Sequence, residues 1–163
     1  MLRAYFRFDR ELLGKLSQCA YRSLKEFFRK TLNRPEGVPG TVISIQTFGD
    51  LVNFHPHFHC LVTDGCFMPN GWFHVLPEIE VKKLKNLFRH KVFKMLLREK
   101  KISRELVDKL RSWKNSGFNI HNQVKIQTYD SHGRESLAQY ILRVWAVQKR
   151  VVDLKQIAGV FPH

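Results

Sequence analysis

The sequence predicts an α+β fold in which helices pack on an antiparallel β-sheet. Two observations carry this prediction: strand-like alternation in the middle of the chain, and helix-spaced apolar residues on both sides of it. The 163 residues, 44% of them hydrophobic, suit one globular domain with its own core. The longest apolar runs stay well below the roughly 18 residues of a membrane span, so we expect no membrane contact.

The first third of the chain predicts a short strand, a long helix and a break. Residues 3–8 alternate charged and apolar side chains, which is typical of a strand. Asp9 can cap the helix that follows, and the break is "NRPEGVPG", which has two prolines and two glycines. Helical spacing up to about Leu32 is carried by Leu12, Leu13, Leu16, Ala20, Leu24, Phe27 and Phe28.

Two hairpins are predicted next. "TVISIQTF" (41–48) and "HFHCLVTD" (57–64) read as antiparallel partners joined by "GDLVNFHP". "GCFM" (65–68) and "WFHVL" (72–76) flank the turn "PNG" and form the second hairpin. We expect the strands to form one antiparallel sheet, with the histidine segment on a central strand.

From Glu78 onward the apolar spacing becomes helical again. A long basic helix carries Leu84, Leu87, Phe88, Val92, Met95 and Leu96 on one stripe. Ser103 is the expected cap of another helix. Alternation over 120–126 predicts a further strand, and "YDSHGRES" predicts a polar turn. A last helix should present Leu137, Tyr140, Ile141 and Val144 on one side.

The charge of the chain is strongly positive and unevenly spread. Lys and Arg number 28 against 14 acidic residues, a net charge of +14. Between Lys82 and Lys114 there are 13 basic and 3 acidic residues, so most of the excess lies in one fifth of the length. Such an imbalance favours a phosphate-facing surface over an ordinary solvated helix face. We expect DNA contacts from Lys82, Lys83, Lys85, Arg89 and Lys91, and from Arg143 farther on.

The most informative segment is "FHPHFHCLV" (54–62). In a strand, residues two apart share a face, so His57 and His59 project together while Phe58 and Cys60 project oppositely. Imidazole is a common metal ligand, and two on one rigid strand fix a metal's position. Two such histidines also occur as ordinary surface or core residues. His55 lies at the strand entry and suits a supporting role or a DNA contact, whereas His121 and His132 read as surface residues.

The histidine segment resembles the HUH superfamily of single-strand DNA nickases, and more narrowly the rolling-circle, or two-tyrosine, insertion-sequence transposases. The resemblance runs from about Leu2 to Arg143, through "YFRFDRELL", "GVPGTVISIQTFGDLVNFHPHFHCLVTDGCF" and "RESLAQYILR". It implies an HUH endonuclease-like fold, single-stranded DNA at transposon ends as substrate, and a bacterial, cytoplasmic and nucleoid-associated protein. The chain has three cysteines, an odd number that does not suggest a set of disulfides, and this fits a reducing compartment.

By that resemblance, His57 and His59 match the histidines that hold a divalent cation, Mg²⁺ or Mn²⁺. Tyr140 matches the nucleophile that attacks a phosphodiester and forms a 5′-phosphotyrosine link. The third ligand stays open: Asp50 lies seven residues before His57, while Gln46 lies on the expected partner strand. Tyr140 also falls on an apolar stripe, where a core role is the alternative.

The chain departs from the resembled family at three points. Members carry a cysteine-rich zinc-binding region before the shared part. Here Met1 lies almost at the start of the shared part. A second tyrosine often precedes the first by four residues, where this chain has Ser136. Residues 144–163 read as an atypical tail after a domain of residues 1–143. The chain is then either an active transposase domain or a decayed remnant. A non-catalytic nucleic-acid-binding protein and a metal-dependent hydrolase that uses water are the alternatives.

Overall fold

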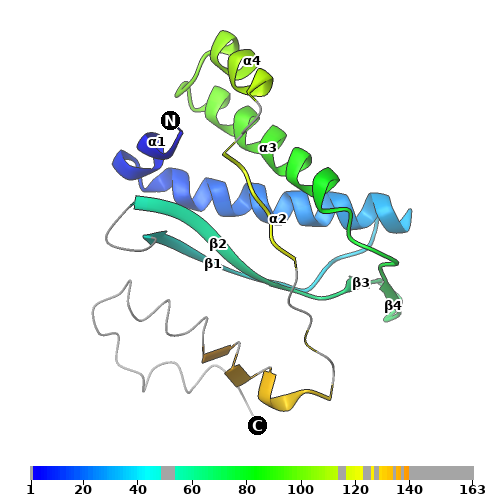
Figure 1. Cartoon of the computed structure of the whole chain (residues 1–163). Coiled ribbons are helices and arrows are strands. Elements are labelled where there is room, and N and C mark those ends of the chain that lie inside the picture. Colours follow the sequence, from blue (N-terminus) through cyan, green and yellow to red (C-terminus); the bar gives the residue numbers. More distant parts are fainter. Residues whose placement is uncertain are drawn as a thin grey trace.

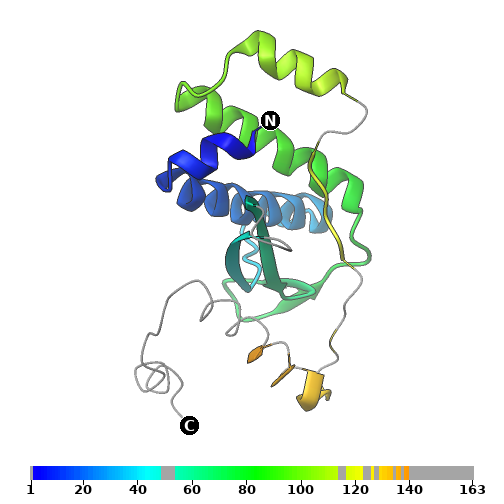
Figure 2. The same cartoon turned by 60° about the vertical axis from the view of Figure 1, so that its left-hand side comes forward.

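The computed structural model describes residues 2–48, 54–113, 117–122, 126, 129–133, 135, 136, 138 and 139. Helices α1 (Arg3–Phe8) and α2 (Glu11–Leu32) come first, and α3 (Val81–Arg98) and α4 (Arg104–Ser112) follow four strands. The strands are β1 (Thr41–Phe48), β2 (Phe54–Val62), β3 (Gly65–Phe67) and β4 (Phe73–Val75). The four helices lie on one side of the β1–β2 ribbon (Figures 1 and 2). The α+β class with antiparallel strands and packed helices is confirmed.

Both predicted hairpins are present, but they form two sheets instead of one. β1 pairs with β2 and β3 pairs with β4, each antiparallel. The β1–β2 register extends to Gly40 and Thr63, whose backbones are bonded. Beyond that point Val38 pairs with Phe67, which shifts the register by two residues. That offset interrupts the hydrogen-bond ladder between the two hairpins. In the part of the chain that the structure describes, β2 has β1 as its strand neighbour, so the prediction that β2 is a central strand is not confirmed.

Three local predictions were wrong. Residues 3–8 form the helix α1, in which Phe6 is buried. Six residues are too few for a helical spacing of apolar side chains to be recognised in the sequence. Ile120 and Ile126 lie in no strand. The expected turn at 129–136 is already helical from Ser131, since Asp130 accepts a hydrogen bond from the Gly133 amide (2.7 Å) and so caps that turn. Leu137, Tyr140, Ile141 and Val144, expected on one helix face, lie outside the described residues.

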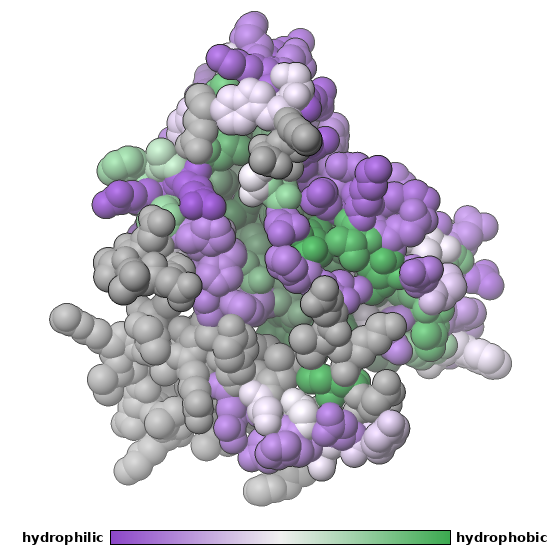
Figure 3. All heavy atoms as spheres, in the orientation of Figure 1, coloured by the Kyte–Doolittle hydropathy of each residue, from purple (hydrophilic) through white to green (hydrophobic). Residues whose placement is uncertain are grey.

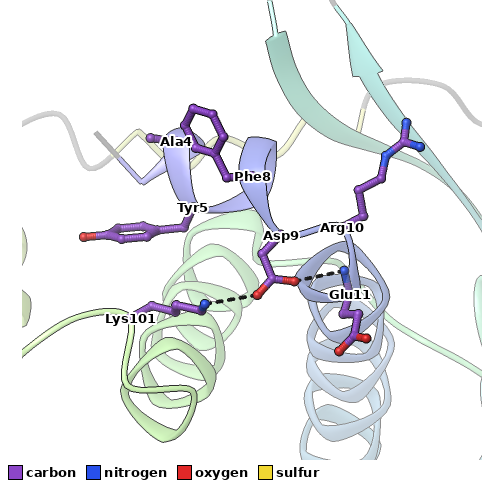
Figure 4. Close-up of a pocket in the computed structure, with 7 residues that line it drawn as sticks. All are labelled: Ala4, Tyr5, Phe8, Asp9, Arg10, Glu11 and Lys101. Atoms are coloured by element: carbon purple, nitrogen blue, oxygen red, sulfur yellow. Dashed lines mark hydrogen bonds and ion pairs between the residues drawn. The ribbon is translucent and has the colours of Figure 1, made fainter.

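The termini of the long helices are set by short-range bonds. Asp9 accepts a hydrogen bond from the Glu11 amide (3.2 Å) at the start of α2 and pairs with Lys101 (3.1 Å), as Figure 4 shows. α2 ends at Asn33 in the left-handed conformation (φ 52°), which asparagine tolerates better than most residues. Ser103 caps α4 by accepting from the Leu106 amide, as predicted. Among the described residues, no helix is long and apolar enough to cross a membrane.

Two apolar clusters position the strands, and α2 contributes to both. The first cluster joins α2 to α3 and α4 and includes the β2 residues Phe54 and Phe58 at its margin. Phe58 packs edge-on against Phe88 of α3, with ring centroids 6.2 Å apart. The second cluster lies beneath the β3–β4 hairpin and consists of Phe27, Phe28, Cys66, Met68, Leu76 and Leu84. β2 therefore turns the face that carries Phe54, Phe58 and Val62 toward the core.

One ion pair holds α2 to α3. The Lys91 ammonium lies 2.6 Å from the Glu26 carboxylate. Lys30, one helical turn after Glu26 on α2, pairs with the same carboxylate. Hydrogen bonds from Lys30 and Lys91 lower the pKa of Glu26 from 4.5 to about 2. A carboxylate whose pKa is lower in the folded state stabilises that state above its unfolded pKa. The stabilisation is therefore present above pH 4.5 and is lost as the pH falls toward 2.

Glu26→Gln should lower the free energy of unfolding at pH 7 by about 1–2 kcal/mol, because the half-buried Lys91 loses its partner while solvent screens part of the effect. The difference from wild type should shrink as the pH falls below 4.5. Urea unfolding at pH 7 and pH 3 measures both quantities. Glu80→Gln is the matched control, since Glu80 pairs with Lys83 on an exposed helix start and should change stability by less than about 0.5 kcal/mol. A Glu26→Gln deficit that is equal at both pH values would contradict this account.

Candidate functional site

The two histidines of the expected metal site lie side by side on β2. The ring centroids of His57 and His59 are 5.1 Å apart. The β1–β2 register places Gln46 opposite His57 and Ser44 opposite His59, so all four side chains share one face of the ribbon. Phe58, between the two histidines, packs toward α3 on the other face. The prediction that His57 and His59 share a strand face is confirmed.

The His57 ring is held in a defined orientation. Its Nδ1 lies 2.7 Å from the backbone carbonyl oxygen of His55. A carbonyl oxygen only accepts hydrogen bonds, so Nδ1 must carry the proton and Nε2 keeps its lone pair in the neutral ring. Metal-binding histidines in proteins are commonly oriented in this way, by donating the second ring N–H to a carbonyl or carboxylate. His55 is the second residue of β2, at the strand entry as predicted, and it supports the site through its backbone carbonyl.

Burial keeps the neighbouring imidazoles neutral. The pKa of His59 is lowered, first by burial and then by the proximity of His57. The pKa of His55 is lowered by burial, by Arg3 and by His57. A neutral imidazole is the form that donates a lone pair to a metal, so these shifts favour metal binding near neutral pH.

The partner strand supplies oxygen atoms beside the imidazoles. Gln46 carries an amide oxygen on the histidine face, and Ser44 is 8% exposed with an Oγ that has no hydrogen-bond partner among the described residues. The sequence alone did not single out Ser44; only the strand register places it opposite His59. Imidazole nitrogen together with amide or hydroxyl oxygen suits a divalent cation such as Mn²⁺. The residues present therefore fit the cation that the sequence implied.

The described residues add no third imidazole, thiolate or carboxylate to the histidine pair. In the part of the chain that the structure describes, no three His, Cys, Asp or Glu side chains gather as a metal site would require. Asp50 lies outside the described residues, in the connection between β1 and β2. Gln46 is thus the candidate third ligand that the structure places beside His57.

The basic residues of α3 differ in what they contact. Lys82 and Lys83 are exposed at the start of the helix, and Lys85 and Arg89 are half-buried. Lys91 is 21% exposed and its ammonium is bound to Glu26, so it joins α3 to α2. Lys83 pairs with Glu80 but remains exposed, so the start of α3 is the most exposed part of the predicted DNA surface among the described residues.

The tyrosine prediction concerns a region with few described positions. Tyr140 and Arg143 lie outside the described residues. Helical positions recur at 131–133, 135–136 and 138–139 just before Tyr140. Ser136, His132 and Tyr129 are exposed, as is His121 upstream. The prediction that His121 and His132 are surface residues is confirmed.

The chain was compared with known protein families, curated proteins and solved structures. A family model described as "Putative transposase" matches residues 40–161. The matched range contains both hairpins, Tyr140, most of residues 144–163 and the basic residues Lys82, Lys83, Lys85 and Arg89 of α3. No curated protein and no solved structure matches the chain. The match covers about three quarters of the sequence.

Proposed function

Because this chain belongs to the transposase family whose model it matches, we propose that it nicks and joins single-stranded DNA through a covalent tyrosine intermediate, as an HUH nickase of the two-tyrosine type. The observation that carries the proposal is the pair His57 and His59 on one face of β2, with the His57 ring oriented by a backbone carbonyl. The family match supports DNA as the substrate, and the paired imidazoles support a reaction that uses a divalent cation.

In the proposed reaction, His57 and His59 hold a divalent cation, with Gln46 or Asp50 as the third ligand. The cation, when bound, would offset the charge that develops on the scissile phosphate. The Tyr140 oxygen attacks the phosphorus, its proton leaves to solvent or a nearby base, and the 3′-oxygen of the preceding nucleotide departs as a hydroxyl. A phosphotyrosine ester replaces the phosphodiester, so the bond energy is retained for rejoining to another 3′-OH.

A denaturing gel tests the proposal. A single strand that contains an end of the element is labelled either in its 5′ half or in its 3′ half and is incubated with the protein and Mn²⁺. The protein should become covalently joined to the 3′ half only. Chelation of the cation should prevent the adduct. Cleavage with no adduct would replace the proposal with a hydrolase that uses water. Binding with neither cleavage nor adduct would leave a non-catalytic DNA-binding protein.

The basic start of α3 should contribute directly to DNA affinity. Replacing Lys82, Lys83 and Lys85 together by Gln should flatten the slope of log affinity against log salt by about 2, because each phosphate contact in a single strand contributes about −0.7. Fluorescence anisotropy with a labelled oligonucleotide over a range of salt concentrations measures the slope.

A second triple variant makes the control charge-matched. Arg104, Lys109 and Arg111 are exposed on α4, at the opposite end of the helical layer from the start of α3 (Figure 1). Replacing these three by Gln removes the same charge and should leave the slope nearly unchanged. Equal flattening by both triples would show that net charge, and not the start of α3, accounts for the salt dependence.

A further inference from the structure

The outer face of the β3–β4 hairpin is aromatic and exposed. Phe67 and Phe73 are directly opposite each other across the two strands, with ring centroids 4.8 Å apart. They are 51% and 38% exposed. The inner face of the same hairpin carries Cys66, which is fully buried in the second cluster. The hairpin is thus anchored to the core by one face while the other displays two adjoining rings.

This aromatic face is wider than the two rings. Val38 pairs with Phe67 through two backbone hydrogen bonds of 2.9 Å and is itself exposed. Val75 lies two residues from Phe73 on the same face and is 59% exposed. Figure 3 shows apolar surface on the right-hand side of the view, where α3 begins and the hairpin lies, beside hydrophilic side chains. A contiguous apolar patch with a polar rim marks an interaction site.

The patch continues the face that carries the histidines. One step along the ribbon from His59, Leu61 and Val42 face each other and are 44% and 54% exposed. One step farther, Gly40 lies opposite Thr63, and a Cβ at Gly40 would meet both the Thr63 side chain and the Phe67 ring. The Phe67 ring therefore covers Gly40 on the same side of the ribbon as Leu61. Exposed side chains connect the histidine pair to the hairpin without a change of face.

We propose that the aromatic face of the β3–β4 hairpin stacks on the bases of the single strand whose phosphate is held near His57 and His59. The inference rests on the proposed function and assigns it a base-binding surface. Exposed rings on a strand pair bind single strands of varied sequence, because every base has a face to stack.

Charge selects nucleic acid over a second copy of the chain as the occupant. α3, with Lys82 and Lys83 exposed in its first turn, begins at Val81, after the exposed Glu78 and Glu80 that follow β4. A second copy would bring its own net charge of +14 to this patch, whereas a polyanion would be attracted.

Phe67→Ala and Phe73→Ala should each weaken binding of a single-stranded oligonucleotide roughly 10-fold at fixed salt. The salt slope should stay as in wild type, because stacking neutralises no phosphate. Phe8→Ala is the matched control: this phenylalanine is 85% exposed on α1, away from the hairpin, and its loss should leave affinity unchanged. Binding is measured by anisotropy with a chelator present, so that no cleavage or covalent step contributes.

Two further variants separate stacking from packing. Phe73→Trp keeps an aromatic ring and should retain the affinity for DNA. Phe67→Leu still covers Gly40 with an apolar side chain but has no ring to stack on a base, so its affinity for DNA should fall. Thermal unfolding of every variant checks the fold. Wild-type affinity in both alanine variants would overturn the inference, whether or not an adduct forms in the gel assay. Unchanged DNA affinity with a wild-type dimer that the variants convert to monomer would assign the patch to a second copy. Absence of the adduct with reduced binding by the alanine variants would overturn the proposed chemistry alone.

Discussion

Replacing His57 or His59 by alanine is expected to abolish Mn²⁺ binding and leave the protein folded. Each change removes one of two imidazoles held 5.1 Å apart by a single strand. The loss should exceed the 10–100-fold that removal of an outer-shell partner typically costs. Neither side chain belongs to the apolar clusters, so thermal unfolding should change little. Isothermal titration calorimetry with Mn²⁺ measures the affinity.

His74→Ala provides the matched control for that experiment. His74 is a half-buried histidine in a strand, but it lies on β4 in the other sheet. Its replacement should leave Mn²⁺ affinity as in wild type. Gln46→Ala then tests the third ligand: a large loss of affinity would assign the ligand to β1, and no loss would favour Asp50. Equal affinity in wild type, His57→Ala and His59→Ala would exclude the metal site.

Tyr140→Phe is expected to eliminate the covalent adduct without affecting the binding of DNA or metal. The substitution deletes one oxygen and retains the ring, so a tyrosine that serves only in packing would tolerate it. An uncharged phenol has a pKa of about 10 and attacks poorly, so the reaction also needs the cation. Tyr140→Phe should therefore bind Mn²⁺ normally, whereas His57→Ala should lose both the metal and the adduct.

Tyr129→Phe is the control for the nucleophile. Tyr129 is 86% exposed and is the nearest other tyrosine in the sequence. Its variant should form the adduct as wild type does. Adduct formation by Tyr140→Phe and its loss in Tyr129→Phe would move the nucleophile to Tyr129. If both variants still form the adduct, the covalent link is on another residue.

The sequence predicted the long elements because many residues carried each pattern. The 22 residues of α2 and the 18 of α3 repeat their apolar spacing over several turns. The six residues of α1 do not complete two turns, so their alternation was read as a strand. The two hairpins were found from alternation and turn residues. Their division into two sheets was not, because a two-residue register offset leaves no compositional trace.

The candidate site was predictable only in the residues that chemistry makes conspicuous. His57 and His59 were recognisable from their types and spacing alone. Ser44 and the orienting carbonyl of His55 were not, because one depends on cross-strand register and the other on a backbone atom that every residue possesses. The aromatic face was likewise hidden, since Phe67 and Phe73 look like ordinary core residues until their exposure is known.

α2 contacts the core beneath both ends of the proposed DNA path. Its first half packs in the cluster that includes Phe58 behind the histidine strand, and its second half supplies Phe27 and Phe28 behind the hairpin. A 22-residue helix is about 33 Å long, so one rigid element supports the strands at both places. On the proposed DNA path, the number of nucleotides between a stacked base and the reacting phosphate would be set by the stretch of ribbon between His59 and Phe67, which packs on this helix. The spacing between the recognised bases and the cut would be a property of the fold, inherited whatever sequence the bases have.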